Sequence, residues 1–172
     1  LYNASTLRVV ISHYPIRSIK EIGGALTGPW EVPVVRVFGK KLGLVEVENR
    51  MLRKVFDEPA VHLALVRAAR GSPELRNGPY LGDSLPEQFV DQGRRFLSNP
   101  TWNSVDARNR IIFLSPIFKW YREDFVKRSG SVLEFVQFYL SPEMSDALGQ
   151  GEFKIKFTPY DWSLNELKPE KP

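Results

Sequence analysis

The chain has 172 residues, 24 Lys and Arg against 20 Asp and Glu, and no cysteine. A chain of this length fits one domain that hides roughly 70% of its unfolded surface, so we expect one domain over 1–166 and a flexible tail over 167–172. The absence of cysteine excludes disulfides and thiolate metal sites, and no apolar run reaches the roughly 18 residues of a membrane span. The charges are interspersed, which indicates a soluble protein and disfavours nucleic acid as a partner.

The first part of the chain predicts a helix, a hairpin and a second helix. Apolar residues near helical spacing predict an opening helix over 1–14, which Pro15 ends. This helix is already under way at the first residue, so we expect an upstream part of it, and a signal peptide could precede it. The stretch VVRVFGKKL predicts a strand, a turn at Gly39 and a returning strand, followed by a helix from about Val45. The run VHLALV at 61–66 fits a strand or a helix almost equally, and we expect a strand.

The second part predicts helices that flank further strands. Ser84 and Glu87 have the spacing of a capping box and predict a helix that runs to about Leu97. The same spacing recurs at Ser131 and Glu134. The remaining expected elements are a hairpin bent at 106–109, helices beyond Ser115, after Ser131 and at 142–149, and a strand at 153–157. Helices grouped at both ends predict an α+β fold in which helices surround a mainly antiparallel sheet.

Several segments, in order along nearly the whole chain, resemble one family. They are LYNASTL, HYPIRSIKEIG, GLVEVENRMLR, DEPAVHLALVRAARGSPELR, LSPIFKWYREDF and YDWSLN. The chain is identified by them as a member of the uncharacterised family called domain of unknown function 547. The resemblance implies no established activity. Members of the family occur in bacteria, where they are often exported, and in plants and animals, so the resemblance favours a bacterial protein in the periplasm or outside the cell. It also implies an architecture similar to the papain and transglutaminase-like folds.

The chain departs from the family pattern at two positions. The pattern around His62 resembles H-F-A-L-x-C-x-x-x-S-C-P, which places the usual cysteines on Arg67 and Ser72. A thiolate is a strong nucleophile, whereas a guanidinium cannot attack and a serine needs an adjacent base. If either cysteine is catalytic in the family, this chain is an inactive or altered member. If the cysteines only packed together or formed a disulfide, the departure removes no function.

His62 is the candidate general base, because imidazole titrates near neutral pH. Ser72 could serve as its hydroxyl nucleophile and Asp161 could orient the ring, as in a catalytic triad. The alternative is that His62 is a core histidine with satisfied nitrogens and that Ser72 belongs to a turn with Pro73.

The candidate ligand-binding residues combine aromatic rings with polar groups. Asn3 lies where a papain-type fold would place its nucleophile, but an amide does not attack carbonyls and is more typical of structural hydrogen bonding. Arg67 needs a buried anionic partner, an exit to solvent or a bound anion. The aromatic candidates are Trp120, Tyr121, Tyr160 and Trp162, for which core packing is the alternative.

The sequence therefore predicts a noncatalytic domain that binds a small ligand, a peptide or a protein. The alternative is a hydrolase or acyl-transferase-like enzyme that uses His62 with a hydroxyl nucleophile. We expect no metal, because His13 and His62 have no metal-ligand spacing. We expect no nucleotide cofactor, because the chain lacks a glycine-rich phosphate loop.

Overall fold

The computed structural model describes residues 1–24, 27–149 and 151–167, and most of its regular structure is helical. The helices are α1 (Tyr2–His13), α2 (Leu44–Glu46), α3 (Lys54–Phe56), α4 (Val61–Ala64), α5 (Leu85–Leu97), α6 (Ile117–Trp120), α7 (Arg122–Ser129), α8 (Val132–Gln137) and α9 (Pro142–Gly149). Two 3₁₀ turns, η1 (Ile19–Glu21) and η3 (Gly82–Ser84), and a π-helix, η2 (Val47–Arg53), complete the helical elements of the described residues.

The strands form two small sheets, so the fold is α+β as expected. Strands β1 (Val35–Val37) and β2 (Lys40–Leu42) make an antiparallel hairpin. Strands β3 (Ser104–Asp106), β4 (Ile111–Leu114) and β5 (Lys154–Phe157) form a second sheet in the order β3-β4-β5. The β3 and β4 strands are antiparallel, whereas β5 lies parallel to β4.

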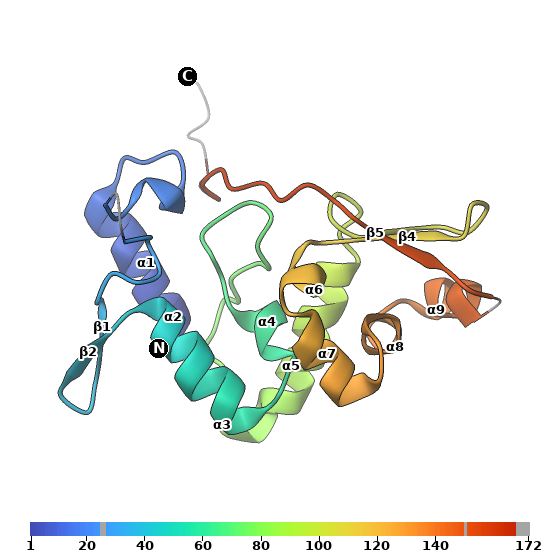
Figure 1. Cartoon of the computed structure of the whole chain (residues 1–172), viewed down its shortest axis with the longest axis horizontal. Helices are drawn as coiled ribbons and strands as arrows, with labels where there is room; N and C mark the ends of the chain where they lie inside the picture. The colour runs from blue at the N-terminus through green and yellow to red at the C-terminus, as the bar shows by residue number, and fades with distance from the viewer. Residues whose placement is uncertain (25–26, 150, 168–172) are drawn as a thin grey trace.

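The buried side chains that the structure describes gather in three clusters, and the two that meet at α4 are the two halves of the core on either side of it. Figure 1 shows α1 and the β1–β2 hairpin on one side, α5 to α9 with the larger sheet on the other, and α4 between them. Leu63 packs into the large cluster, which also contains Phe118 and Phe125. Leu65 packs into a smaller cluster with Tyr2 of α1 and Val47 of η2. The short segment around α4 therefore joins the two halves of the core.

The expected strand at 61–66 was wrong, because residues 61–64 form helix α4. Asp57 adopts a left-handed conformation at the end of α3 and reverses the chain. The Glu58 carboxylate then accepts a hydrogen bond from the Ala60 amide at 3.0 Å, and the Glu58 carbonyl accepts one from the Val61 amide. No side chain caps α4, so the turn fixed by these hydrogen bonds starts the helix even where the side chains suit either structure.

Other expectations were confirmed with changes of detail. Helix α5 covers the expected span, but Ser84 makes no side-chain cap and belongs to η3 instead. Ser131 does cap α8, by accepting a hydrogen bond from the Glu134 amide. The predicted second helix corresponds to three consecutive elements, α2, η2 and α3, of which the central one, η2, is a π-helix. The expected tail at 167–172 lies outside the described residues except for Leu167.

Candidate functional site

Helix α4 places the His62 ring between the two halves of the core. The His62 side chain is 0% exposed. Its Nε2 atom lies 2.7 Å from Asp124 Oδ2 of α7, and its ring stacks on Tyr121 with centroids 3.8 Å apart. Its Nδ1 atom lies 3.8 Å from Glu48 Oε1 and makes no hydrogen bond within the described residues. Only one ring nitrogen therefore has a hydrogen-bonding partner, and that partner is a carboxylate.

Burial decides the charge of this histidine. Removal from solvent lowers the pKa of His62 from 6.5 to about 4, although hydrogen bonding to Asp124 acts in the opposite direction. Hydrogen bonding from Arg53 lowers the pKa of Asp124 to about 2. At neutral pH the imidazole is therefore neutral and the carboxylate is ionised. This assigns the ring proton to Nε2, which donates to Asp124.

A buried ion pair lies beside His62. Arg67 Nη2 donates to Glu48 Oε1 at 3.2 Å and to the Tyr121 hydroxyl at 2.7 Å, and the Tyr2 hydroxyl donates to Glu48 Oε2 at 3.3 Å. Burial is the largest single influence on the pKa of Arg67 and lowers it, but Glu48 together with Tyr121, Tyr2 and Tyr160 outweighs burial, so the pKa is raised and the guanidinium stays charged. Arg67 therefore has the buried anionic partner that its place in an apolar segment demands.

Besides His62, Asp124 also binds Arg53 of η2. Arg53 Nε and Nη2 donate to the two Asp124 oxygens at 2.7 and 2.9 Å, a bidentate arrangement that fixes both groups. Arg53 Nη1 also donates to Asn49 Oδ1 at 2.8 Å. The π-helix thus supplies both Glu48 and Arg53 to the same group of side chains. We call Glu48, Arg53, His62, Arg67, Tyr121 and Asp124 the polar network.

Ser72 and Asp161 lie outside this network and make other hydrogen bonds. The Ser72 hydroxyl oxygen accepts a hydrogen bond from the Arg67 amide at 2.9 Å, within the turn that follows α4. The Asp161 carboxylate accepts hydrogen bonds from the amide and hydroxyl of Ser163. Across the described part of the chain, no hydrogen bond joins His62 to either residue.

Asn3 ties the start of α1 to the end of α4. Its Nδ2 atom donates to the Ala64 carbonyl at 2.9 Å, and its Oδ1 atom accepts from the Val66 amide at 3.0 Å. Both functions of the amide are therefore used in holding the backbone beside His62. This contact is structural in kind, and it brings Asn3 to the edge of the pocket described below.

The other aromatic candidates form a cluster of their own. The Tyr160 and Trp162 ring centroids lie 4.4 Å apart, and Trp120 lies 4.8 Å from Tyr160. Trp30 joins at the edge of Trp162. Tyr121 is separate from this cluster, because it belongs to the polar network.

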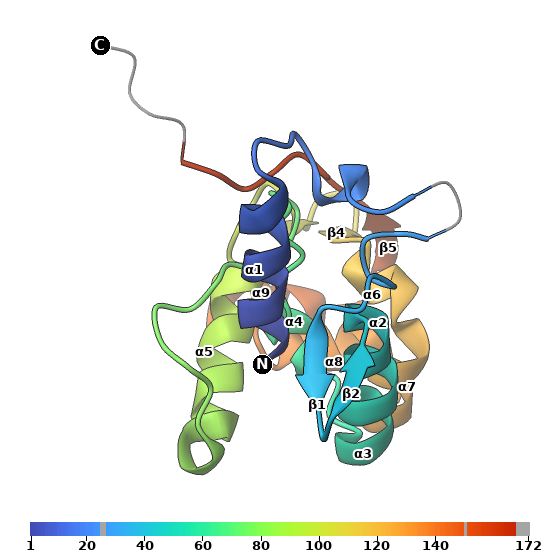
Figure 2. The ribbon, with the colours of Figure 1, turned by 90° about the vertical axis from the view of Figure 1, so that its left-hand side faces the viewer.

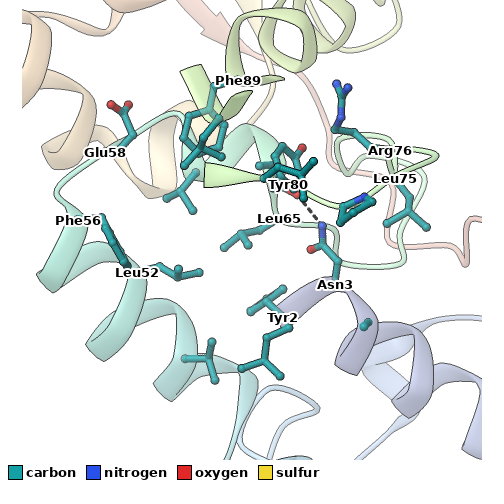
Figure 3. Close-up of a pocket in the computed structure, with 18 of the residues that line it drawn as sticks. Tyr2, Asn3, Leu52, Phe56, Glu58, Leu65, Leu75, Arg76, Tyr80 and Phe89 are labelled. Atoms are coloured by element: carbon teal, nitrogen blue, oxygen red, sulfur yellow. Dashed lines mark hydrogen bonds between the residues drawn. The ribbon is translucent and has the colours of Figure 1, made fainter. Parts of the chain in front are cut away.

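A largely apolar pocket opens on the other side of α4. Its volume is about 690 Å³, within the range of small-molecule sites. Figure 3 shows Tyr2, Leu52, Phe56 and Leu65 around the open space, with Asn3 and Tyr80 at its side. Exposed apolar side chains also line it, namely Leu1, Leu7, Phe56, Leu75 and Leu81. Such a concentration of exposed apolar surface is typical of a binding site.

The pocket and the polar network share their walls. Val61, Ala64 and Leu65 of the α4 segment line the pocket, while His62 points into the network. Val47, Met51 and Leu52 of η2 line the pocket, while Glu48 and Arg53 point into the network. The same two elements thus separate an ionic layer from an apolar cavity.

Sequence reasoning found His62, Arg67 and Tyr121 but missed Glu48 and Arg53. Charged residues in an amphipathic helix ordinarily face solvent, and the sequence carries no signal for the π-helix that turns these two inward. Asp124 follows Trp120 and Tyr121 closely in the sequence, but its pairing with His62 depends on tertiary structure.

The described residues contain no group of three or more acidic or histidine side chains placed to hold a metal ion. In the same residues, no helix is both long enough and apolar enough to cross a membrane.

Comparison with known proteins yields one match. The profile of the family described as "Protein of unknown function, DUF547" matches residues 1–97, which include α1, the polar residues of η2, α4 and all the residues that line the pocket. The segments LSPIFKWYREDF and YDWSLN lie beyond the matched residues. No curated protein and no solved structure matches the chain. More than half of the chain matches the family profile, and the chain therefore belongs to the DUF547 family.

Proposed function

We propose that this chain is a noncatalytic binding domain whose ligand occupies the apolar pocket beside α4. The observation that carries the proposal is the environment of His62. One of its nitrogens is bonded to Asp124, its side chain is 0% exposed, and no hydroxyl group bonds the other nitrogen within the described residues. A general base must reach the proton that it removes, and a sealed imidazole with a pKa of about 4 has neither the access nor the basicity.

The residues that replace possible nucleophiles support the same proposal. Arg67 stands where the family pattern has a cysteine, and its guanidinium is committed to Glu48 and Tyr121. Asn3, at the position that a papain-type architecture would give to a nucleophile, is committed to the α4 backbone. On this proposal both positions stabilise the wall of a binding pocket.

The pocket itself indicates the ligand. Its lining is mostly Leu, Val, Met, Phe and Ala, so the ligand is a largely apolar small molecule or the apolar side chains of a peptide. Burial of apolar surface contributes roughly 25 cal/mol per Å², and a pocket of this volume accommodates enough of it for measurable affinity.

The alternative is a hydrolase or acyl-transferase that uses His62. The pairing of Nε2 with Asp124 leaves Nδ1 as the free acceptor, which resembles a triad in pairing a carboxylate with a neutral histidine but exchanges the roles of the two ring nitrogens. A hydroxyl at Nδ1 would complete it. The Ser72 hydroxyl accepts a hydrogen bond from the Arg67 amide instead. The structure therefore supports the carboxylate and the histidine of such a site but supplies no nucleophile.

Binding of an apolar fluorescent probe, anilinonaphthalene sulfonate, tests the proposal. Ala4 lies on an exposed part of α1 and lines the pocket, so Ala4→Phe fills the cavity without entering the core. We expect roughly tenfold weaker probe binding with little change in thermal stability. Ile11→Phe is the matched control, because Ile11 is exposed on the same helix and is absent from the lining.

Equal probe affinity in the wild type and Ala4→Phe would contradict the pocket as the binding site. Robust ester or amide hydrolysis by the purified chain, lost in His62→Gln while the fold is retained, would contradict the noncatalytic role. The two outcomes are separable, because the first variant leaves the polar network intact.

The proposal also covers the bounds of the domain, its architecture and its location in the cell. We infer one domain over 1–166, with the two halves of the core joined by α4, and an architecture of the papain and transglutaminase-like kind. A periplasmic or extracellular location accords with the family resemblance.

A further inference from the structure

The tip of the β1–β2 hairpin has an unusual residue for its turn. Val37 pairs with Lys40, so Phe38 and Gly39 alone form the bend. Both have positive φ, 46° for Phe38 and 79° for Gly39. Two-residue turns with two positive φ angles favour Asn-Gly or Asp-Gly, because a bulky side chain is strained in that conformation. Gly39 fits this turn, whereas Phe38 does not.

Packing does not account for Phe38 either. Its side chain is 98% exposed, the highest value among the aromatic side chains that the structure describes. A residue that is strained and also gains no burial contributes nothing to the stability of the hairpin. Departures of this kind from local preference are concentrated at functional sites.

The residues around Phe38 are cationic. Residues 33–45 contain Arg36, Lys40 and Lys41 and no carboxylate. All three cations are exposed, and none takes part in an ion pair within the described ranges. The tip is therefore a protruding aromatic ring with three exposed, unpaired cations on the two strands that carry it.

A second exposed apolar element lies at the same end of the molecule. Figures 1 and 2 both place the hairpin tip and helix α3 at the lower edge of the chain. Helix α3 exposes Val55 and Phe56, at 68% and 67%, next to the exposed Lys54. This end thus presents apolar side chains and cations together.

We propose that this end of the molecule docks on an anionic lipid surface. Phe38 inserts at the boundary between head groups and acyl chains, where exposed aromatic side chains are stable. Arg36, Lys40 and Lys41 contact the anionic head groups, as cations next to a membrane surface do. The strained turn is retained because it holds the ring away from the protein.

The shape of the patch favours lipid over nucleic acid. Single-stranded nucleic acid is bound along a positively charged groove that carries several stacking platforms. The hairpin tip offers one ring on a narrow projection, which is sufficient to enter an interface and insufficient to follow a strand. The net charge of the tip complements an anionic leaflet.

Co-sedimentation of the whole chain with vesicles tests the proposal. We expect binding to vesicles of phosphatidylcholine mixed with phosphatidylserine, little binding to phosphatidylcholine alone, and a decrease with added salt. Each cation near an anionic leaflet contributes roughly fivefold in affinity, so Lys40→Glu/Lys41→Glu weakens binding at least about twentyfold. Lys154→Glu/Lys156→Glu is the matched control, with the same change of charge on exposed β5 and no expected loss.

Phe38→Asn separates docking from folding. Asn suits the turn, so the variant melts at the same or a higher temperature than the wild type. Removal of the ring nevertheless lowers vesicle affinity by about tenfold. Phe138→Asn, which removes an exposed ring from the end of α8, is the control and keeps full binding.

Three results would overturn the proposal: equal binding to neutral and anionic vesicles, equal losses in the hairpin and control variants, or no vesicle binding alongside tight binding of a single-stranded polyuridine probe. The last would assign the tip to nucleic acid. The variants leave the apolar pocket unchanged, because Phe38 and the three cations are absent from its lining and only Phe56 of α3 belongs to both surfaces.

Discussion

The two sides of the wall formed by η2 and α4 differ in almost every physical respect. On one side, Glu48, Arg53 and His62 enter a polar network that is held by hydrogen bonds and aromatic stacking. On the other, Leu52 and Leu65 line an open apolar pocket. A buried ionic layer has few alternative arrangements, whereas an apolar lining accepts many occupants. The comparison indicates that the polar network holds η2 and α4 in place, and that these two elements in turn form a fixed wall of the pocket.

The largest effect is expected where the network loses a charge. Glu48→Leu leaves Arg67 buried without its carboxylate, and removing one partner of a buried pair costs about 3–5 kcal/mol in the free energy of unfolding. Urea denaturation measures this loss. Arg50→Gln is the control, because its partner is Glu46 and its side chain is 73% exposed, so the change stays below about 1 kcal/mol. Similar losses of unfolding free energy in both variants would contradict the claim that the polar network contributes more to stability than a surface ion pair.

The next effect concerns pH. The folded pKa of His62 is about 4, below the ordinary value of 6.5, so the unfolded chain binds a proton between these values and the folded chain does not. Stability therefore falls as pH decreases from 6.5 to 4, by on the order of 3 kcal/mol from this group. The depressed pKa of Asp124 adds a loss below pH 4.

Urea titrations at several pH values test this account with His62→Gln as the comparison. The variant is less stable at neutral pH, because it loses the stacking on Tyr121 and the hydrogen bond to Asp124. Its stability changes less between pH 6.5 and 4 than that of the wild type. Parallel curves for the two proteins would contradict the neutral, buried state of His62.

The smallest effect is expected at Ser72. Ser72→Ala removes a hydrogen bond to the Arg67 amide, which contributes about 1 kcal/mol to the free energy of unfolding. Ser163→Ala, at an exposed hydroxyl, changes stability by less than about 0.5 kcal/mol. A hydrolytic activity that disappears in Ser72→Ala while the stability loss remains this small would assign Ser72 a catalytic role.

The sequence predicted the elements with strong local signals. The opening helix that ends before Pro15, the hairpin at Gly39 and helix α5 follow from periodicity and from residues that terminate or bend the chain. Helix α4 was missed because its start depends on the turn at Asp57 and on the hydrogen bonds of Glu58 rather than on its own side chains. The parallel pairing of β5 was missed because strand partners far apart in sequence leave no local trace.

The candidate site was also predicted only in part, because local signals identify single residues but not their partners in space. His62 and Arg67 were recognisable because a polar residue inside an apolar run needs a partner. Their partners, Glu48 and Asp124, occur in helical segments whose charges also suit solvent, so sequence alone could not choose them. The pocket could not be predicted, because its lining combines residues from α1, η2, α4 and the segment before α5.

Nitrogen-15 NMR of the histidine rings across pH tests the central claim most directly. The chain contains only His13 and His62, so a His13→Gln variant assigns both. The account predicts that His62 is a neutral ring protonated at Nε2 from pH 8 down to about pH 5 and gains its second proton near pH 4. A His62 that titrates near 6.5, with solvent access to Nδ1, would contradict the sealed network and favour a catalytic base.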